Sequence, residues 1–212
     1  MNEVTGVILA GGKSKRMGVN KALLDINGRK NIERIKLQLS QVTKKMIVIT
    51  NTPSVYDFLN LPLVEDAFKD KGPLAGIHSG LMASTTEWNL FIACDLPFFT
   101  PEIANFYIEL LKNDDRTKEA DAIVPYIQGR KNPLVAMYNK RIVPIVESNL
   151  KNDKLVIATV LDELNVVKVT EKDFLDAGMS IEEINDAFFN MNRPEDYDYV
   201  LNKLETSDYL EG

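Results

Sequence analysis

The sequence of 212 residues has only one cysteine, Cys94, and only one histidine, His78. A single cysteine excludes an intramolecular disulfide and a zinc site built from several thiolates. A single histidine excludes histidine-rich metal sites, and a catalytic triad would have to be built around His78. We expect His78 to be a packing or helix-surface residue and Cys94 to be a small core residue.

The chain also lacks long apolar runs and an excess of positive charge. No apolar stretch approaches the ~20 residues that cross a membrane as a helix. The first residues, MNEVTGVILAGG, have neither the basic start nor the cleavage site of a signal peptide. These features predict a cytoplasmic protein without a membrane partner. Acidic residues number 31 and basic residues 25, which argues against nucleic-acid binding, because that function needs a basic face.

Short apolar runs alternate with segments of helical spacing. The first half predicts strands at residues 4–10, 46–50, 62–64 and 88–94 and helices at 31–42, 53–60, 74–85 and 101–112. The second half predicts strands at residues 122–126, 134–138 and 166–169 and helices at 141–150, 155–164 and 194–204. Strand–helix alternation indicates right-handed crossovers and a mostly parallel sheet.

We therefore expect an α/β protein with one domain over residues 1–212. Three layers, α/β/α, would enclose a Rossmann-like, mostly parallel sheet. The connection between the strands at 122–126 and 134–138 is short, which predicts an antiparallel strand in the second half.

Positive charge gathers just after the first predicted strand. Four basic residues occupy nine positions without any acid from Val4 to Leu24: Lys13, Lys15, Arg16 and Lys21. Glycines at 11, 12 and 18 allow the backbone to approach a ligand closely. The pattern is neither a Walker A loop nor the dinucleotide-binding GxGxxG. It indicates either a polyphosphate-binding loop or a solvated basic loop.

Two carboxylates follow other predicted strands. Asp66 comes after the third strand and Asp95 after the fourth. Ligands of an open parallel sheet bind beyond the carboxyl ends of its strands, so the basic loop and these carboxylates should share one edge. Asp95 could hold Mg²⁺ beside a polyphosphate, or it could be a turn or capping residue.

Five segments together resemble a known family. They are Leu9–Gly28, which has the form LAGGxSxRMGxxKALLxxxG, and Glu65-Asp66, Gly72–Gly76, Cys94–Pro97 and Asn190–Asp196. This set resembles the molybdenum cofactor guanylyltransferases, which are nucleotidyltransferases of the glycosyltransferase-A-like fold. Two positions depart from related patterns. Asn20 precedes the lysine where related enzymes usually have proline, and Tyr197 replaces the leucine of NxNxPEDL.

The resemblance implies that a terminal phosphate of molybdopterin attacks the α-phosphorus of GTP and expels pyrophosphate. It assigns GTP binding to Leu9, Ala10, Gly11, Gly12, Lys21, Asn51, Asp66 and Asp95. It assigns Mg²⁺ to Asp95, and the catalytic work to Arg16, Lys21 and Asp95. For molybdopterin we expect Arg130, Asn132, Asn190 and Asn192. Because the cofactor is labile, the resemblance also suggests cofactor-synthesis proteins and apo-molybdoenzymes as partners.

Other functions remain open at this point. A sibling enzyme transfers CMP to the same cofactor, and other small nucleotidyltransferases share the first motif. A nucleotide sensor or a carrier of the finished cofactor is the non-catalytic alternative. Lys21 and Asp95 speak against it, since a pure binder need not keep a metal carboxylate.

Overall fold

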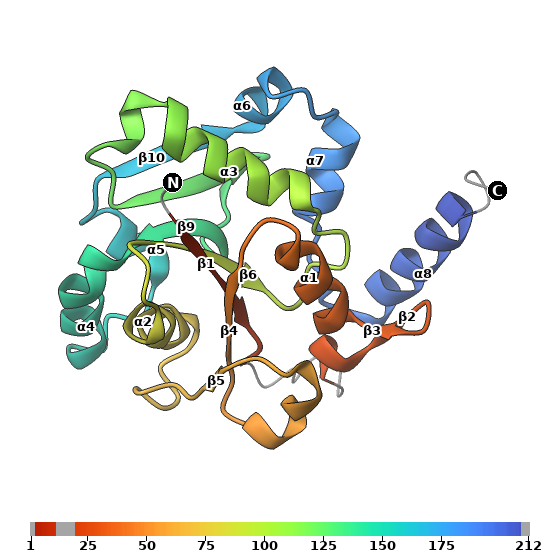
Figure 1. Cartoon of the computed structure of the whole chain (residues 1–212), viewed down its shortest axis with the longest axis horizontal. Helices are drawn as coiled ribbons and strands as arrows, with labels where there is room; N and C mark the ends of the chain where they lie inside the picture. The colour runs from red at the N-terminus through yellow and green to blue at the C-terminus, as the bar shows by residue number, and fades with distance from the viewer. Residues whose placement is uncertain (1–2, 12–19, 209–212) are drawn as a thin grey trace.

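The computed structural model describes residues 3–11 and 20–208. The predicted site residues Gly12 and Arg16 therefore lie outside the described residues. A central sheet is covered by helices on both faces (Figure 1). Its strands are β1 (Val4–Leu9), β4 (Lys45–Ile49), β5 (Leu63–Val64), β6 (Trp88–Ala93), β7 (Ala122–Ile127), β8 (Arg130–Lys131), β9 (Val135–Asn139) and β10 (Val166–Thr170).

The strand order is β10-β7-β9-β6-β1-β4-β5, with β8 paired to β7. Strand β1 runs parallel to both β4 and β6, and β5 runs parallel to β4. Strand β9 is antiparallel to β6 and to β7, whereas β10 is parallel to β7. The mostly parallel sheet and the antiparallel strand of the second half are thus confirmed.

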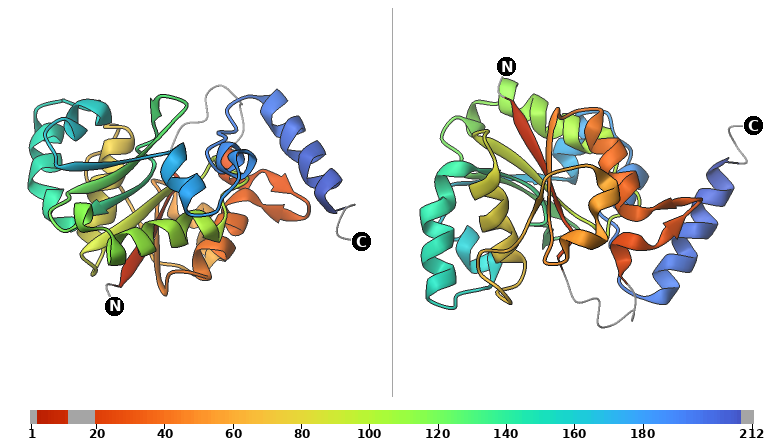
Figure 2. Two further views of the ribbon diagram at one scale, coloured as in Figure 1. Left: turned by 90° about the horizontal axis from the view of Figure 1, so that it is seen from above. Right: turned by 60° about the horizontal axis from the view of Figure 1, so that its bottom comes forward.

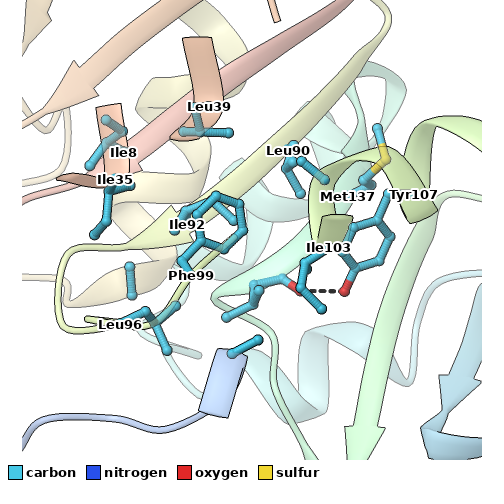
Figure 3. Packing of buried hydrophobic residues seen from close by; sticks show 14 of the residues in the cluster. Ile8, Ile35, Leu39, Leu90, Ile92, Leu96, Phe99, Ile103, Tyr107 and Met137 are labelled. Carbon is cyan, nitrogen blue, oxygen red and sulfur yellow. Dashed lines mark hydrogen bonds between the residues drawn. The ribbon is translucent and has the colours of Figure 1, made fainter. Parts of the chain in front are cut away.

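The helices cover the two faces of the sheet, except for the last helix, which lies to one side of it (Figure 1). They are α1 (Asn31–Ser40), α2 (Pro73–Ala83), α3 (Pro101–Asn113), α4 (Val143–Lys151), α5 (Ile157–Leu161), α6 (Glu171–Asp176), α7 (Ile181–Ala187) and α8 (Pro194–Asp208). Helices α1 and α3 pack on one face of the sheet and share one hydrophobic core with it (Figure 3). Helices α2, α4 and α5 share a second core on the other face. Within the described part of the chain, no helix is long and apolar enough to span a membrane.

Strand β1 shows why the sheet is buried on both sides. All six of its residues are buried. Val4 and Ile8 belong to the core under α1 and α3. Val7 and Leu9 belong to the core under α2. Successive side chains of a strand point to opposite faces, so a continuous apolar run satisfies both layers at once.

The predicted helix at 53–60 is wrong. The structure has two 3₁₀ turns there, η2 (Pro53–Val55) and η3 (Asp57–Leu59). Tyr56 between them has φ −117° and ψ 8°, which interrupts helical backbone. Asn60 then adopts the left-handed conformation with φ 51° and ends the second turn.

A hairpin that the sequence analysis did not predict follows the first loop. Strand β2 (Asp25–Ile26) pairs antiparallel with β3 (Arg29–Lys30). Asn27 and Gly28 form the turn with φ 52° and 78°, as an Asn-Gly hairpin turn requires. Helix α8 lies beside this hairpin (Figure 2). Ile26, Met191 and Val200 bury a small separate core between them. The hairpin thereby fixes the segment that leads into α8.

Candidate functional site

A pocket of about 240 Å³ lies at the carboxyl ends of β1, β4 and β6. Its walls come from segments that are far apart in the sequence: Leu9, Ala10, Gly11, Asn20, Lys21, Ile49, Asp66, Gly72, Pro73, Gly76, Ala93, Cys94, Asp95 and Leu134. The three strands are parallel neighbours, so the loops that follow them converge at one edge of the sheet. The basic-loop residue Lys21 and both predicted carboxylates therefore share one cavity.

Lys21 occupies the centre of a polar cluster. Its Nζ lies 3.5 Å from Asp95 Oδ2 and donates a 2.6 Å hydrogen bond to Asn192 Oδ1. Only 14% of the lysine side chain is exposed. Lys21 begins a 3₁₀ turn, η1 (Lys21–Leu23), and Asn20 caps this turn by accepting a hydrogen bond from the backbone N–H of Ala22. The turn geometry thus aims a cation at a largely buried carboxylate.

Burial and a neighbouring cation have opposite effects on the carboxylate of Asp95. Burial raises its pKa, although the nearby Lys21 ammonium acts in the opposite direction. Its Oδ1 atom is buried and has no hydrogen-bond partner among the described residues. A carboxylate oxygen is a hard donor and Asp95 lines the pocket, which fits the coordination preference of Mg²⁺. Asp95 therefore could hold a magnesium ion.

Asp66 and Asn51 form a second polar pair at the pocket wall. Asn51 Nδ2 donates to Asp66 Oδ2 at 2.7 Å, and the backbone N–H of Asp66 donates to Asn51 Oδ1 at 3.2 Å. Lys69 Nζ also donates to Asn51 Oδ1, at 3.1 Å. Burial raises the pKa of Asp66, and its Oδ1 atom has no hydrogen-bond partner in the described part of the chain. The pair thus presents an acceptor that a ligand hydroxyl or N–H could satisfy.

Two glycines lie next to the Asp66 carboxylate. A Cβ atom on Gly11 would lie 3.8 Å from Asp66 Oδ2, and one on Gly76 would lie 3.8 Å from Asp66 Oδ1. The Gly76 Cβ would also lie 3.0 Å from Leu9 Cδ2, which is tighter than ordinary contact. Gly76 lies in the first turn region of α2, whose start at Gly72 and Pro73 also lines the pocket. A helix N-terminus at a cavity favours a negatively charged ligand.

Residues 6–167 match the family model described as the MobA-like NTP transferase domain. The chain belongs to this family. It is 37% identical over 201 residues to a probable molybdenum cofactor guanylyltransferase of Carboxydothermus hydrogenoformans, which covers 95% of this chain and 96% of the relative. It is 35% identical over 173 residues to the molybdenum cofactor guanylyltransferase of Desulfosudis oleivorans, with 81% of this chain and 83% of the relative covered.

A solved structure supports the fold of this MobA-like chain. The molybdopterin-guanine dinucleotide biosynthesis protein A of Archaeoglobus fulgidus superposes with a TM-score of 0.79. The match covers 95% of this chain and 99% of that protein, at 23% sequence identity. The expected α/β class and the recognised family are thus confirmed.

The structure brings most of the predicted GTP-site residues together. Leu9, Ala10, Gly11, Lys21, Asp66 and Asp95 all line the pocket. Asn51 joins them through its bonds to Asp66. The pocket also includes Asn20 and Gly76, which were not among the predicted GTP-binding residues. Asn20 could have been found from its position, because asparagine before a turn of helix is a preferred cap.

The four residues expected at molybdopterin lie in two places. Asn192 reaches Lys21, and exposed Asn190 donates to the carbonyl oxygen of Phe188 at 3.1 Å. Arg130 is exposed on β8, and Asn132 Nδ2 donates to the Arg130 carbonyl oxygen at 3.0 Å. The structure therefore places Asn192 at the pocket, whereas Arg130 and Asn132 belong to the β7–β8 hairpin.

The two single-copy residues behave as packing groups. Cys94 is partly buried against the core beside the pocket, and burial raises the pKa of its thiol to about 12. His78 is buried on α2, in edge contact with the ring of Phe68 at 5.1 Å between centroids. Burial lowers the pKa of His78. Both groups are therefore neutral at pH 7, and the structure assigns neither a nucleophile nor a charged acid to them.

Proposed function

We propose that this protein transfers GMP from GTP to the terminal phosphate of molybdopterin, with release of pyrophosphate. The observation that carries the proposal is the juxtaposition of Lys21 with Asp95 in a pocket whose other wall holds the Asp66–Asn51 pair. Relatives that are 35% and 37% identical over most of the chain bear the name of molybdenum cofactor guanylyltransferase. We propose that residues 1–212 act as one nucleotidyltransferase domain in the cytoplasm.

The chemistry of the pocket suits transfer of a nucleotidyl group. An in-line displacement at phosphorus needs alignment of the two phosphates and neutralisation of charge, and it requires no protein nucleophile. Lys21 supplies a fixed cation, because Asp95 and Asn192 hold its ammonium group from two sides. A preorganised charge stabilises developing negative charge without a cost of rearrangement. Lys21 therefore would contact the phosphates of GTP and the departing pyrophosphate.

Asp95 would hold Mg²⁺, with its unpartnered buried Oδ1 as the donor. When bound, Mg²⁺ would supply positive charge to the phosphates and act as a Lewis acid. Asp95 also orients Lys21 through their 3.5 Å contact. The Asp95 carboxylate would thus both bind the metal ion and orient the Lys21 ammonium group.

The nucleoside would occupy the part of the pocket between the end of β1 and α2. Leu9, Ala10 and Gly11 line that end, and Asp66 offers its unpartnered oxygen. Asn51 fixes the carboxylate of Asp66 in place by two hydrogen bonds. We assign the guanine and ribose of GTP to this end, because acceptors at this wall match their N–H and hydroxyl donors.

Molybdopterin would approach Lys21 from the side of α8. Asn192 connects this side to Lys21, and the backbone N–H of Met191 donates to the carbonyl oxygen of Asp95 at 2.9 Å. The segment before α8 is therefore bonded to both proposed catalytic residues. Asn190, two positions before Asn192, would extend this subsite, whereas Arg130 and Asn132 would contact molybdopterin from the β7–β8 hairpin. Cofactor-synthesis proteins and apo-molybdoenzymes would be the macromolecular partners.

The test is to supply GTP, CTP, UTP or ATP separately with Mg²⁺ and molybdopterin and to measure pyrophosphate and the dinucleotide product. We expect turnover with GTP only, and its loss in Asp95→Ala with the fold retained. Turnover with CTP alone would replace this proposal by the cytidylyltransferase alternative. Tight nucleotide binding without pyrophosphate release would favour a sensor or a carrier.

A further inference from the structure

Tyr56 is a fully buried side chain close to the site but outside the family motifs described above. It lies between the turns η2 and η3, and both hold its backbone. Its N–H donates to the Pro53 carbonyl oxygen at 2.8 Å, and its own carbonyl oxygen accepts from the N–H of Leu59 at 2.9 Å. The ring is part of the core under α1 and α3. The backbone and the ring of Tyr56 are thus both held in place.

The hydroxyl of Tyr56 joins two segments that border the basic loop. It accepts a 2.9 Å hydrogen bond from Asn20 Nδ2 and lies 3.3 Å from the carbonyl oxygen of Ala10, to which it donates. Burial raises the pKa of Tyr56, so the hydroxyl keeps its proton for this bond at neutral pH. Ala10, just before Gly11, and Asn20, just before Lys21, are therefore connected through the hydroxyl oxygen of Tyr56.

Both connected residues belong to the nucleotide pocket. Ala10 is fixed from two sides, because its N–H donates to the Ile49 carbonyl oxygen at 2.9 Å while its own carbonyl oxygen accepts from Tyr56. Asn20 uses its amide N–H₂ on Tyr56 and its Oδ1 on the N–H of Ala22, at 3.1 Å. The same asparagine thus couples Tyr56 to the turn that carries Lys21.

We propose that Tyr56 is a positioning residue for nucleotide binding, which holds Ala10 and the Lys21 turn in register through its hydroxyl. The identity of the nucleotide rests on the proposed function, whereas the positioning role does not depend on which base is bound. Without the hydroxyl, the Ala10 carbonyl and the Asn20 amide lose their shared partner. The nucleotide then has to order Ala10 and Asn20 when it binds. The conformational entropy lost in this ordering weakens binding.

The test compares Tyr56→Phe with a matched control, Tyr107→Phe. Tyr107 is also fully buried, and its hydroxyl donates to the Val135 carbonyl oxygen at 2.7 Å in the core drawn in Figure 3. Both variants delete one buried hydroxyl and keep the ring. We expect similar small decreases in melting temperature. Only Tyr56→Phe should raise the Kd and KM for the nucleotide, by about tenfold (~1.4 kcal/mol), because it loses the hydrogen bond and the order that this bond imposes.

A second variant tests the connection itself. Asn20 is exposed, so Asn20→Ala should fold, and it removes the other end of the hydrogen-bond chain. If the two residues act as a unit, the double variant raises KM little more than the larger single effect. Additive losses, or a KM for Tyr56→Phe equal to that of Tyr107→Phe, would overturn the proposal.

The nucleotide used is the one among GTP, CTP, UTP and ATP that the wild-type protein binds most tightly. Preference for a nucleotide other than GTP would overturn the proposed function, and the Tyr56 comparison would proceed unchanged with that nucleotide. A wild-type protein that binds none of the four would overturn both. The KM for the second substrate should remain the same in Tyr56→Phe, since the hydroxyl bonds only Ala10 and Asn20, which line the nucleotide pocket.

Discussion

Replacement of Asp95 by asparagine should make the protein more stable and inactive. The substitution keeps the shape of the side chain and removes its charge. In the wild-type protein the Lys21 ammonium lies 3.5 Å away, an attraction of about 5 kcal/mol at an effective dielectric constant of ~20. Removing the carboxylate from water costs several kcal/mol. Because the pKa of Asp95 is raised overall, the cost of removing its charged form from water exceeds its attraction to Lys21.

The sign of the pH dependence follows from that raised pKa. Between the ordinary pKa of an aspartate and the raised value, the folded state binds more protons than the unfolded state. Stability contributed by the protonated form is therefore present at low pH and lost as pH rises through the folded pKa. At pH 7 the charged Asp95 destabilises the fold, by on the order of 1 kcal/mol, because the two large terms nearly cancel. Asp95→Asn should recover this energy.

Differential scanning calorimetry without Mg²⁺ measures the effect. For a chain of this size, 1 kcal/mol corresponds to a rise of roughly 2–4 °C in melting temperature at pH 7. The gain should shrink as the pH falls through the raised pKa of folded Asp95, because the protonated carboxyl is uncharged like asparagine. Pyrophosphate release in the same samples should fall by about 10³-fold, because the metal carboxylate is lost. A lower melting temperature at pH 7, or retained turnover, would refute this account of Asp95.

Three further predictions concern other parts of the site and core. Lys21→Met should remain folded and lose ~100-fold or more in kcat/KM for GTP, measured by pyrophosphate release, because a preorganised cation is removed. Gly80→Ala should lower the free energy of unfolding by about 1–3 kcal/mol in a urea titration, since the added Cβ would lie 2.7 Å from Phe91 Cε1. Cys94 should react with iodoacetamide at pH 7.5 at least ~100-fold more slowly than a free thiol, because its pKa is about 12.

Each of these has a result that contradicts it. Loss of folded protein in Lys21→Met would make the lysine a structural residue. A wild-type midpoint in Gly80→Ala would mean that α2 moves off the sheet at little cost. Rapid alkylation of Cys94 would show that the pocket opens far enough to solvate the thiol.

Local sequence patterns predicted the central part of the fold. The run at Val4–Leu9 is mostly apolar and followed by glycines, which predicts a strand covered on both faces, and all six residues are buried. Lys21 and Asp95 were placed correctly at one edge because parallel strands end on the same side. The Asn27–Gly28 hairpin was also readable from its turn residues and was missed. The helix expected at 53–60 failed because the backbone at Tyr56 interrupts it.

By itself, then, the sequence determined the alternating architecture, the edge at which we expect ligands to bind and the residues that carry charge there. These follow from side-chain periodicity and from the direction of strands, which are local properties. Only the tertiary structure decided that Asn192 holds Lys21 from 171 positions away, and that Tyr56 joins Ala10 to Asn20. A hydrogen bond between distant segments leaves no periodic trace in a single sequence, because it depends on how α8 and the 3₁₀ turns pack around the completed sheet.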